Sequence, residues 1–465
     1  MKQSKITENP SKRQPKDSAN VWKNKAKIYR SENTALRKRV KEIIVSRDSW
    51  KTKYKTYKER PEKENILGGV KAKHHQYSIA IVCLILELHK YGSMSLRSCR
   101  NSVGCMLVAL GMTMRLPSHN TIRNWLCKGG FYRLETSKPV SGNYVVYVDE
   151  SIVFGSEKIL LIIGVPLANI PTTRALTHSD MEVLYVGANT EWKAEHIEAE
   201  LEEIAKRKTI IYTVSDEGNN LCKAYKSLKY THIEDCTHIL ANYLKKMYDK
   251  DSDFEAFRKL IGQLRKAWNL SKANSQYMPP MMRGKMRFAN IFPCVQWAQL
   301  HLQDWSNLPE SVRESLSFLK EKELFIIGLG QVSAIFKTVC AVLKNEGFGT
   351  MQHTSILSKL AVISASTDSD KVAIFIKNCK EYLANLSEKS TLLQQAHLLV
   401  SSDIIESFFG KFKTKINTNN RTGLTEFLFT IANFSQSFSV EETKKLLETI
   451  KLKDVKLNKK QRKND

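Results

Sequence analysis

Residues 143–150 read NYVVYVDE, a run of β-branched and aromatic residues that ends in Asp149 and Glu150. Such a run is typical of a buried strand. Residues 209–217, TIIYTVSDE, repeat the arrangement and place Asp216 and Glu217 at the end of a second strand. Two buried strands that each end in carboxylates favour an α/β fold with an acidic group at one edge of a sheet.

The elements around these two strands predict the topology of the sheet. Further strands are expected at 158–165, 182–186 and 230–233, and helices at 190–208, 219–228 and 236–248. The first three strands are joined by short turns and can form an antiparallel meander, whereas the last two need helical crossovers and therefore run parallel. If the two acidic strands are neighbours, Asp149 and Asp216 face each other at the same edge.

Two carboxylates at the ends of adjacent strands suit a pair of divalent cations, Mg²⁺ or Mn²⁺. Such ions would activate a water or a DNA 3′-hydroxyl and stabilise the leaving oxygen. No Gly-x4-Gly-Lys-Ser/Thr motif occurs in the sequence, so a nucleotide cofactor is not expected.

This layout resembles the RNase H-like fold of DDE transposases and integrases. The resemblance implies a third metal-binding carboxylate on a later helix, and the candidate is Glu406 in residues 402–413, SDIIESFFGKFK. The segment is similar to the final catalytic helix of bacterial insertion-sequence transposases, in which a Glu is followed seven positions later by a Lys that touches DNA. Here that position is Lys413, and Lys411 is also expected to hold the DNA backbone.

Residues 232–238, HIEDCTH, resemble a short signature that follows the second Asp in several such families. The resemblance implies that Asp235 and His238 support the site by positioning the DNA strand or a metal-bound water. A histidine at a helix start also has an ordinary structural interpretation. If a neighbouring carboxylate acts instead, the substitutes are Glu150, Glu217, Asp235 and Asp403.

The charge is concentrated at the two ends of the chain. The formal net charge is +26, of which residues 1–73 carry +14 and residues 451–465 carry +5. Such an excess points to a polyanionic partner, and nucleic acid is the usual one. The sequence predicts a disordered basic arm at 1–20 and a basic tail at 441–465.

Residues 21–60 predict a coiled-coil helix that pairs copies of the chain into a homodimer or higher oligomer. Apolar residues recur every seven positions in two seams, although Asn33 and Arg47 interrupt one of them. The alternative is a single amphipathic helix packed on its own protein. The seam positions are Trp22, Tyr29, Leu36, Ile43, Trp50 and Tyr57, and Ala26, Asn33, Val40, Arg47 and Tyr54.

Residues 70–138 predict a helical DNA-binding domain with a helix-turn-helix. Pro117 and Ser118 open its second helix, whose first turns carry Asn120, Arg123 and Asn124. Arginine and asparagine at that place suit base edges in a major groove. Any three-helix bundle can give the same pattern, so the sequence leaves that alternative open.

The remaining segments complete an RNase H-like core that is split by a large all-helical insertion. The core is expected at 140–250 and 396–440, the latter with its final helices and Glu406, and the insertion at 251–395. Arg283 and Lys285, in a polar linker of the insertion, are expected to meet phosphates unless the linker is merely an exposed loop. The resemblance also implies that Trp297 or Trp305 stacks on a flipped base; the alternative is a tryptophan buried in the core.

Together these features predict a DNA transposase that binds the terminal inverted repeats of a mobile element, cleaves the strands and joins them to target DNA. The alternatives are another RNase H-like nuclease, such as a junction resolvase, and a catalytically silent DNA-binding regulator. No stretch is expected to approach the roughly 20 apolar residues of a membrane helix. Nine cysteines without a CxxC pair suggest reduced thiols, and we expect a bacterial cytoplasmic protein associated with the nucleoid.

Overall fold

The computed structural model describes residues 15–58, 69–92, 94–112, 114–154, 157–271, 274–282, 289–416 and 425–455. The chain forms two compact units, Met1–Gly68 with Ser102–Leu116 and Gly69–Asn101 with Pro117–Asp465. Each unit is described by itself. Helix α3 (Leu96–Ala109) crosses from the second unit into the first.

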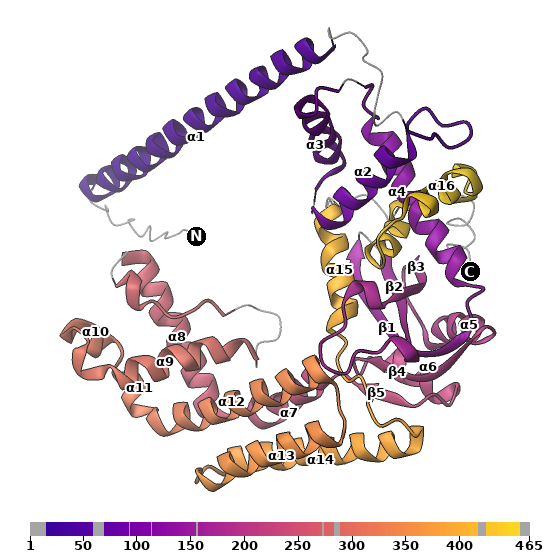
Figure 1. Ribbon diagram of the computed structural model, residues 1–465. Helices are drawn as coiled ribbons and strands as arrows, with labels where there is room; N and C mark the ends of the chain where they lie inside the picture. Colours follow the sequence, from indigo (N-terminus) through magenta and orange to yellow (C-terminus); the bar gives the residue numbers. More distant parts are fainter. Residues whose placement is uncertain are drawn as a thin grey trace, which may run out of the picture. The chain divides into compact units, whose positions relative to one another are not determined.

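The first unit contains the long helix α1 (Pro15–Lys58), which covers residues 21–58 of the segment expected to form a coiled coil (Figure 1). It begins earlier than expected, so residues 15–20 of the predicted disordered arm are helical. Its described seam residues are exposed, with Leu36 at 58% and Ile43 at 61% of their full area. Large apolar side chains in regular register along an exposed helix suit a partner helix. Pairing between copies remains a prediction.

The second unit is built on a mixed five-stranded sheet, which confirms the predicted α/β fold class (Figure 1). The spatial order of the strands is β3-β2-β1-β4-β5. Neighbours in the β1-β2-β3 part are antiparallel, and β4 runs parallel to both β1 and β5, as expected from the connections. The strands are β1 (Gly142–Phe154), β2 (Glu157–Pro166), β3 (Glu182–Asn189), β4 (Lys208–Ser215) and β5 (His232–Glu234).

Strand β1 differs from its expected length, because it continues beyond Asp149 to Phe154. The extension is held by antiparallel pairing with β2, in which Asp149 lies opposite Leu161. The parallel pairing of β1 with β4 ends earlier, at Tyr147 and Val214. Asp149 and Asp216 each follow this last pair by two residues, so they hold equivalent positions on neighbouring strands.

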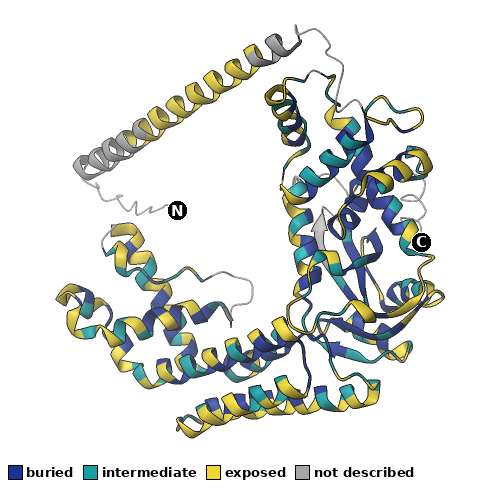
Figure 2. Cartoon of the chain, in the orientation of Figure 1, coloured by how far each residue is buried: buried dark blue, intermediate teal, exposed yellow. Residues whose placement is uncertain are grey.

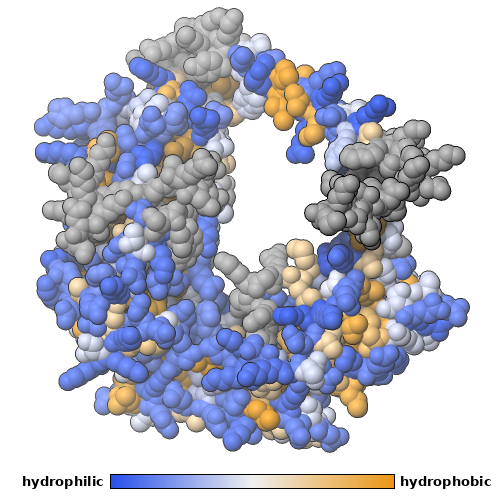
Figure 3. Space-filling model, turned by 180° about the vertical axis from the view of Figure 1, so that it is seen from behind, coloured by the Kyte–Doolittle hydropathy of each residue, from blue (hydrophilic) through white to orange (hydrophobic). Residues whose placement is uncertain are grey.

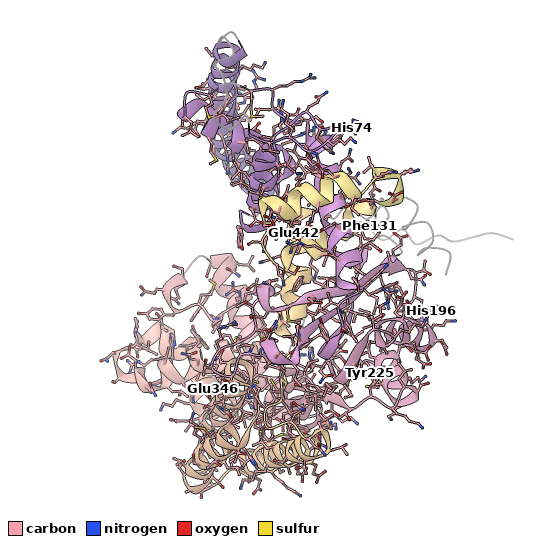
Figure 4. The ribbon with its side chains drawn as sticks, turned by 45° about the vertical axis from the view of Figure 1, so that its right-hand side comes forward. His74, Phe131, His196, Tyr225, Glu346 and Glu442 are labelled. Carbon is pink, nitrogen blue, oxygen red and sulfur yellow. The ribbon has the colours of Figure 1, made fainter. Side chains whose placement is uncertain are left out.

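Helices α5 (Ala194–Ala205) and α6 (Asn219–Ser227) cover one face of the sheet. Figure 4 labels His196 of α5 and Tyr225 of α6 on this side. The core between the layers contains Val146, Val148, Trp192, Ile197, Leu201 and Tyr225, among others. Helix α15 (Asp403–Lys415) packs against β1 and carries Glu406.

The described residues between 252 and 393 are mostly helical, as expected for this part of the chain. Helix α12 lies in the middle and contacts α7, α9, α13 and α14. Contrary to the expectation from the sequence, it is long and apolar enough to cross a bilayer, but more than half of its most apolar stretch is buried inside the structure. The helices are α7 (Cys236–Tyr248), α8 (Ser252–Ser271), α9 (Phe292–Gln303), α10 (Glu310–Ser315), α11 (Ser317–Glu321), α12 (Glu323–Glu346), α13 (Thr350–Ala365) and α14 (Asp370–Leu393).

Hydrophilic side chains predominate on the face of the chain shown in Figure 3, with smaller hydrophobic patches between them. Short 3-10 helices fill the connections. They are η1 (Leu167–Asn169), η2 (His178–Asp180), η3 (Ser275–Tyr277), η4 (Ala289–Ile291), η5 (Trp305–Asn307) and η6 (Glu426–Phe434).

The C-terminal elements η6 and α16 (Val440–Thr449) pack against α2 (Ile79–Tyr91) and α4 (His119–Ser137), and η6 also packs against β3. Figure 4 labels Phe131 of α4 and Glu442 of α16 in this region. The buried Arg133 donates to the carbonyl of Ser437 at 3.0 Å and to Glu442 at 3.1 Å, and lies 3.9 Å from the ring centre of Phe438. Part of the expected basic tail is therefore a packed helix.

Candidate active site

Three carboxylates from three elements converge at one edge of the sheet. Asp149 lies in β1, Asp216 directly follows β4, and Glu406 lies in the first turn of α15. The charges of Asp216 and Glu406 both act on Asp149. The structure therefore brings together the three acidic residues that the sequence singled out.

Asp149 is the most strongly perturbed member of this group. Burial raises its pKa to about 8, and the like charges of Asp216 and Glu406 add to the effect. Glu406 is exposed, but partial desolvation by the surrounding protein still raises its pKa. The nearby His238 opposes both shifts. A carboxyl group that holds its proton near neutral pH marks a place that favours an added positive charge.

The four substitute carboxylates are already engaged with other groups. Glu150 faces Lys158 at 3.5 Å, and Glu217 accepts a hydrogen bond from Asn242 at 2.6 Å. Asp403 pairs with Lys344 at 2.7 Å. Asp235, the fourth, is engaged with Ser402 and His238.

By contrast, no ion pair or side-chain hydrogen bond reaches Asp149 or Glu406 from the described ranges of the chain. The carboxylate of Asp216 accepts one bond, from the backbone N–H of Gly218 at 3.1 Å. These three residues are therefore the better candidates for a site.

Asp235 connects the start of α7 to the start of α15. Its side chain is 1% exposed and accepts from the backbone N–H of Ser402 at 2.6 Å and its hydroxyl at 3.0 Å. The same carboxylate accepts from the backbone N–H of His238 at 2.8 Å and lies 3.1 Å from the Nδ1 atom of its ring. Burial alone would raise the pKa of Asp235, but these hydrogen bonds lower it below its ordinary value. Asp235 thus fixes the helix that carries Glu406.

His238 supplies positive charge beside the acidic group. Its hydrogen bond to Asp235 raises its pKa to about 9 against the opposing effect of burial, and the charges of Asp235, Asp216 and Glu406 add to the increase. The imidazolium is therefore the dominant form at neutral pH. The stability gained from this contact is fully present below pH 6.5 and is lost as the pH rises through 9.

Asp235→Asn should lower the free energy of unfolding by about 2–4 kcal/mol, because an amide cannot accept all the hydrogen bonds that the buried carboxylate receives. The pKa of His238 should fall from about 9 towards its ordinary 6.5. Urea unfolding and an NMR titration of the histidines measure the two effects. Asp403→Asn, which removes the exposed carboxylate of the pair with Lys344, is the matched control and should cost no more than about 1 kcal/mol. An unchanged titration of His238 would contradict the assignment.

The chemistry of the donor set fits a hard divalent cation. Asp149, Asp216 and Glu406 offer only carboxylate oxygens, the ligands preferred by Mg²⁺ and Mn²⁺. Among the residues that the structure describes, no three acidic, histidine or cysteine side chains lie within ligating reach of one point. For all three carboxylates to ligate one ion, at least one of them would therefore have to rotate.

The lysines of α15 differ in their surroundings. Lys415 donates to the carbonyl of His89 at 2.7 Å, and the Nζ atom of Lys411 lies 3.4 Å from Nδ1 of His178. His178 also contacts the hydroxyl of Ser407 at 3.2 Å. Lys413 is exposed and, within the described segments, has no hydrogen-bonding or ionic partner. Of the two lysines expected to contact DNA, Lys413 is the freer.

The residues expected to contact DNA bases differ in their exposure and in their contacts within the protein. Asn120 is exposed at the start of α4, and Asn124 is half-buried. Arg123 pairs with Glu426 of η6 at 2.7 Å and donates to Thr425 at 3.1 Å, so its guanidinium group is already bound within the protein.

The expected phosphate contacts Arg283 and Lys285 lie outside the described residues. The two tryptophans of this region are described. Trp297 is buried and donates to the carbonyl of Tyr277, which supports its core interpretation, and Trp305 is half-buried beside Lys320.

Sequence reasoning missed Ser402 and His178 as supports of α15. The Asp-x-x-His spacing of Asp235 and His238 is typical of a helix N-cap, so this contact can be predicted from the local sequence. The contact of Asp235 with Ser402 joins residues 167 positions apart, and no local pattern indicates it. No protein-family model matches the chain, and no curated protein matches it either.

Proposed function

We propose that the chain is a DDE-type DNA transposase with an RNase H-like catalytic core. The observation that carries the proposal is the convergence of Asp149, Asp216 and Glu406, with the pKa of Asp149 raised to about 8 by burial and by its two acidic neighbours. The strand order β3-β2-β1-β4-β5, in which only β2 runs antiparallel to the other four strands, also supports it. In this proposal the helices between α7 and α15 are an insertion into the core.

In this function Asp149, Asp216 and Glu406 would hold two Mg²⁺ or Mn²⁺ ions. Bound there, the ions would activate the attacking hydroxyl and stabilise the leaving oxygen. Asp235 holds the start of α15 in place, and the imidazolium of His238 attracts the phosphate backbone towards the site. Lys413 provides an exposed positive charge two turns beyond Glu406 for the same backbone.

The other parts of the chain would bring DNA to this site. The helical domain with Asn120 and Asn124 would bind the terminal inverted repeats, and α1 would pair copies through its exposed seam. The basic N-terminal segment would add sequence-independent affinity, which falls steeply with salt. The protein would act on bacterial DNA at the nucleoid.

The test is incubation of the purified protein with Mn²⁺ and a DNA fragment that carries the flanking ends of its own gene. We expect nicking at those ends that depends on the cation and is lost in Asp216→Ala, because that change removes a carboxylate oxygen donor from the site. Products are resolved on denaturing gels.

Three other outcomes separate this function from its rivals. Binding of the ends without any cutting would favour a DNA-binding regulator. Cutting of branched DNA regardless of the ends would favour a junction resolvase. Equal nicking by the wild type and Asp216→Ala would remove Asp216 from the site.

A further inference from the structure

A glycine occupies the middle of the exposed face of α15. Glu406, Gly410 and Lys413 are exposed and spaced by four and three residues, so they form one stripe along the helix. Phe408 and Phe409 are buried on the opposite side. Figure 2 shows exposed positions along α15. Gly410 therefore separates the proposed cation-binding Glu406 from the free ammonium group of Lys413.

The fold itself does not require a glycine at this position. A Cβ atom at Gly410 would meet no described atom within 4 Å, and the backbone there is not left-handed. Glycine inside a helix is less stable than alanine, because it loses more conformational freedom on folding. Gly410 therefore makes α15 locally less stable, and no packing contact in the described part of the chain explains why a glycine stands there.

Glycine is also the residue that lets another molecule approach a backbone closely. The stripe on either side of Gly410 carries the charges that a nucleic-acid strand would meet, a carboxylate group for cations at Glu406 and an ammonium group at Lys413. Seven residues of helix separate the two, or about 10 Å at 1.5 Å per residue. That length matches about three nucleotides of a strand at 3.4 Å each.

We propose that Gly410 is a substrate-contact position, where the sugar–phosphate backbone of the cleaved strand crosses α15 against the helix backbone. The scissile phosphate lies at the Glu406 end of the stripe, and a phosphate about three nucleotides further along the same strand meets Lys413. A side chain at position 410 would lift the strand away from both. This inference rests on the proposed function, because it takes Glu406 as part of a DNA-cleaving site.

The test compares Gly410→Ala and Gly410→Gln with Gly262→Ala. Gly262 is a matched control, since it is also exposed within a long helix, α8, and its Cβ would also meet nothing within 4 Å. All three variants should keep or slightly raise the Tm, by about 1–2 °C. Cation-dependent nicking should fall about tenfold in Gly410→Ala and about 100-fold in Gly410→Gln, and stay unchanged in Gly262→Ala.

The outcomes distinguish this inference from the proposed function. If the wild type nicks DNA with Mn²⁺ and both Gly410 variants nick it as well as Gly262→Ala does, the contact is overturned while the function stands. A lower Tm in Gly410→Ala would show that the glycine serves the fold, which also overturns the contact. If the wild type neither binds nor nicks DNA, the proposed function fails and the inference fails with it.

Discussion

Asp149→Asn is expected to abolish cation-dependent DNA cleavage and, in the same protein, to raise the stability measured in EDTA at pH 8. Both effects have the same cause. The fold places several carboxylates close together and does not neutralise their charges. Asp149 has the largest effect, since it is the member whose pKa is raised most by burial and by Asp216 and Glu406.

The direction in which stability changes with pH follows from the shift in the pKa of Asp149. The pKa of Asp149 is about 8 in the folded protein and near 3.8 in the unfolded chain. Between these values the folded state binds more protons, so this residue lowers the free energy of unfolding as the pH rises from 4 to 8. Asparagine does not titrate, and the variant should gain on the order of 3 kcal/mol at pH 8. Urea unfolding at pH 5 and pH 8, with EDTA present, measures the difference.

Cleavage by the same variant should fall at least about 1,000-fold, which corresponds to about 4 kcal/mol of lost transition-state stabilisation. Glu150→Gln is the control on the adjacent residue, whose carboxylate pairs with Lys158 and acts on Asp149 less than Asp216 and Glu406 do. It should cleave within about threefold of the wild type. Cleavage by Asp149→Asn within tenfold of wild type, or a lower stability of that variant at pH 8, would show that Asp149 is not the key carboxylate.

The sheet and its acidic edge were predictable because their signals are local. Each strand is a short β-branched or aromatic run, and the connection lengths decide between antiparallel and parallel pairing. Asp149 and Asp216 then fall beside each other by register alone. The extension of β1 to Phe154 was not predicted, because an acidic pair is typical of the end of a strand, whereas pairing with β2 continues through Asp149 and Glu150.

The assembly of the N-terminal helices with the C-terminal segment was not predictable in this way. Residues 426–434, EFLFTIANF, are apolar without a clear period and form η6, which is buried along almost its whole length. Its partners on α4 lie about 300 positions earlier, as with Arg123 and Glu426. The place of Arg123 near the start of a helix predicts a DNA contact, and nothing in the local sequence indicates the carboxylate of Glu426 that it meets. Long-range contacts of this kind leave no trace in local spacing.

Gly130→Ala is expected to have the largest effect on stability of any single-methyl change in this assembly. Helix α4 and η6 approach so closely that a Cβ at Gly130 would lie 1.9 Å from the carbonyl oxygen of Phe429 and 2.4 Å from its carbon. Both are backbone atoms, so no side-chain rotation can relieve the overlap. One of the two elements must shift, which also strains the hydrogen bond from Asn433 to the carbonyl of Leu126.

We expect Gly130→Ala to lower the free energy of unfolding by about 2–4 kcal/mol, although alanine favours a helix more than glycine does. Gly262→Ala is the matched control, because the same methyl group enters open space there and should raise stability by about 0.5–1 kcal/mol. Opposite signs for one chemical change would locate the cost in the contact between α4 and η6 and not in helix propensity. Equal urea midpoints for the two variants would mean that η6 does not pack closely against α4. The C-terminal segment would then be able to separate from the N-terminal helices.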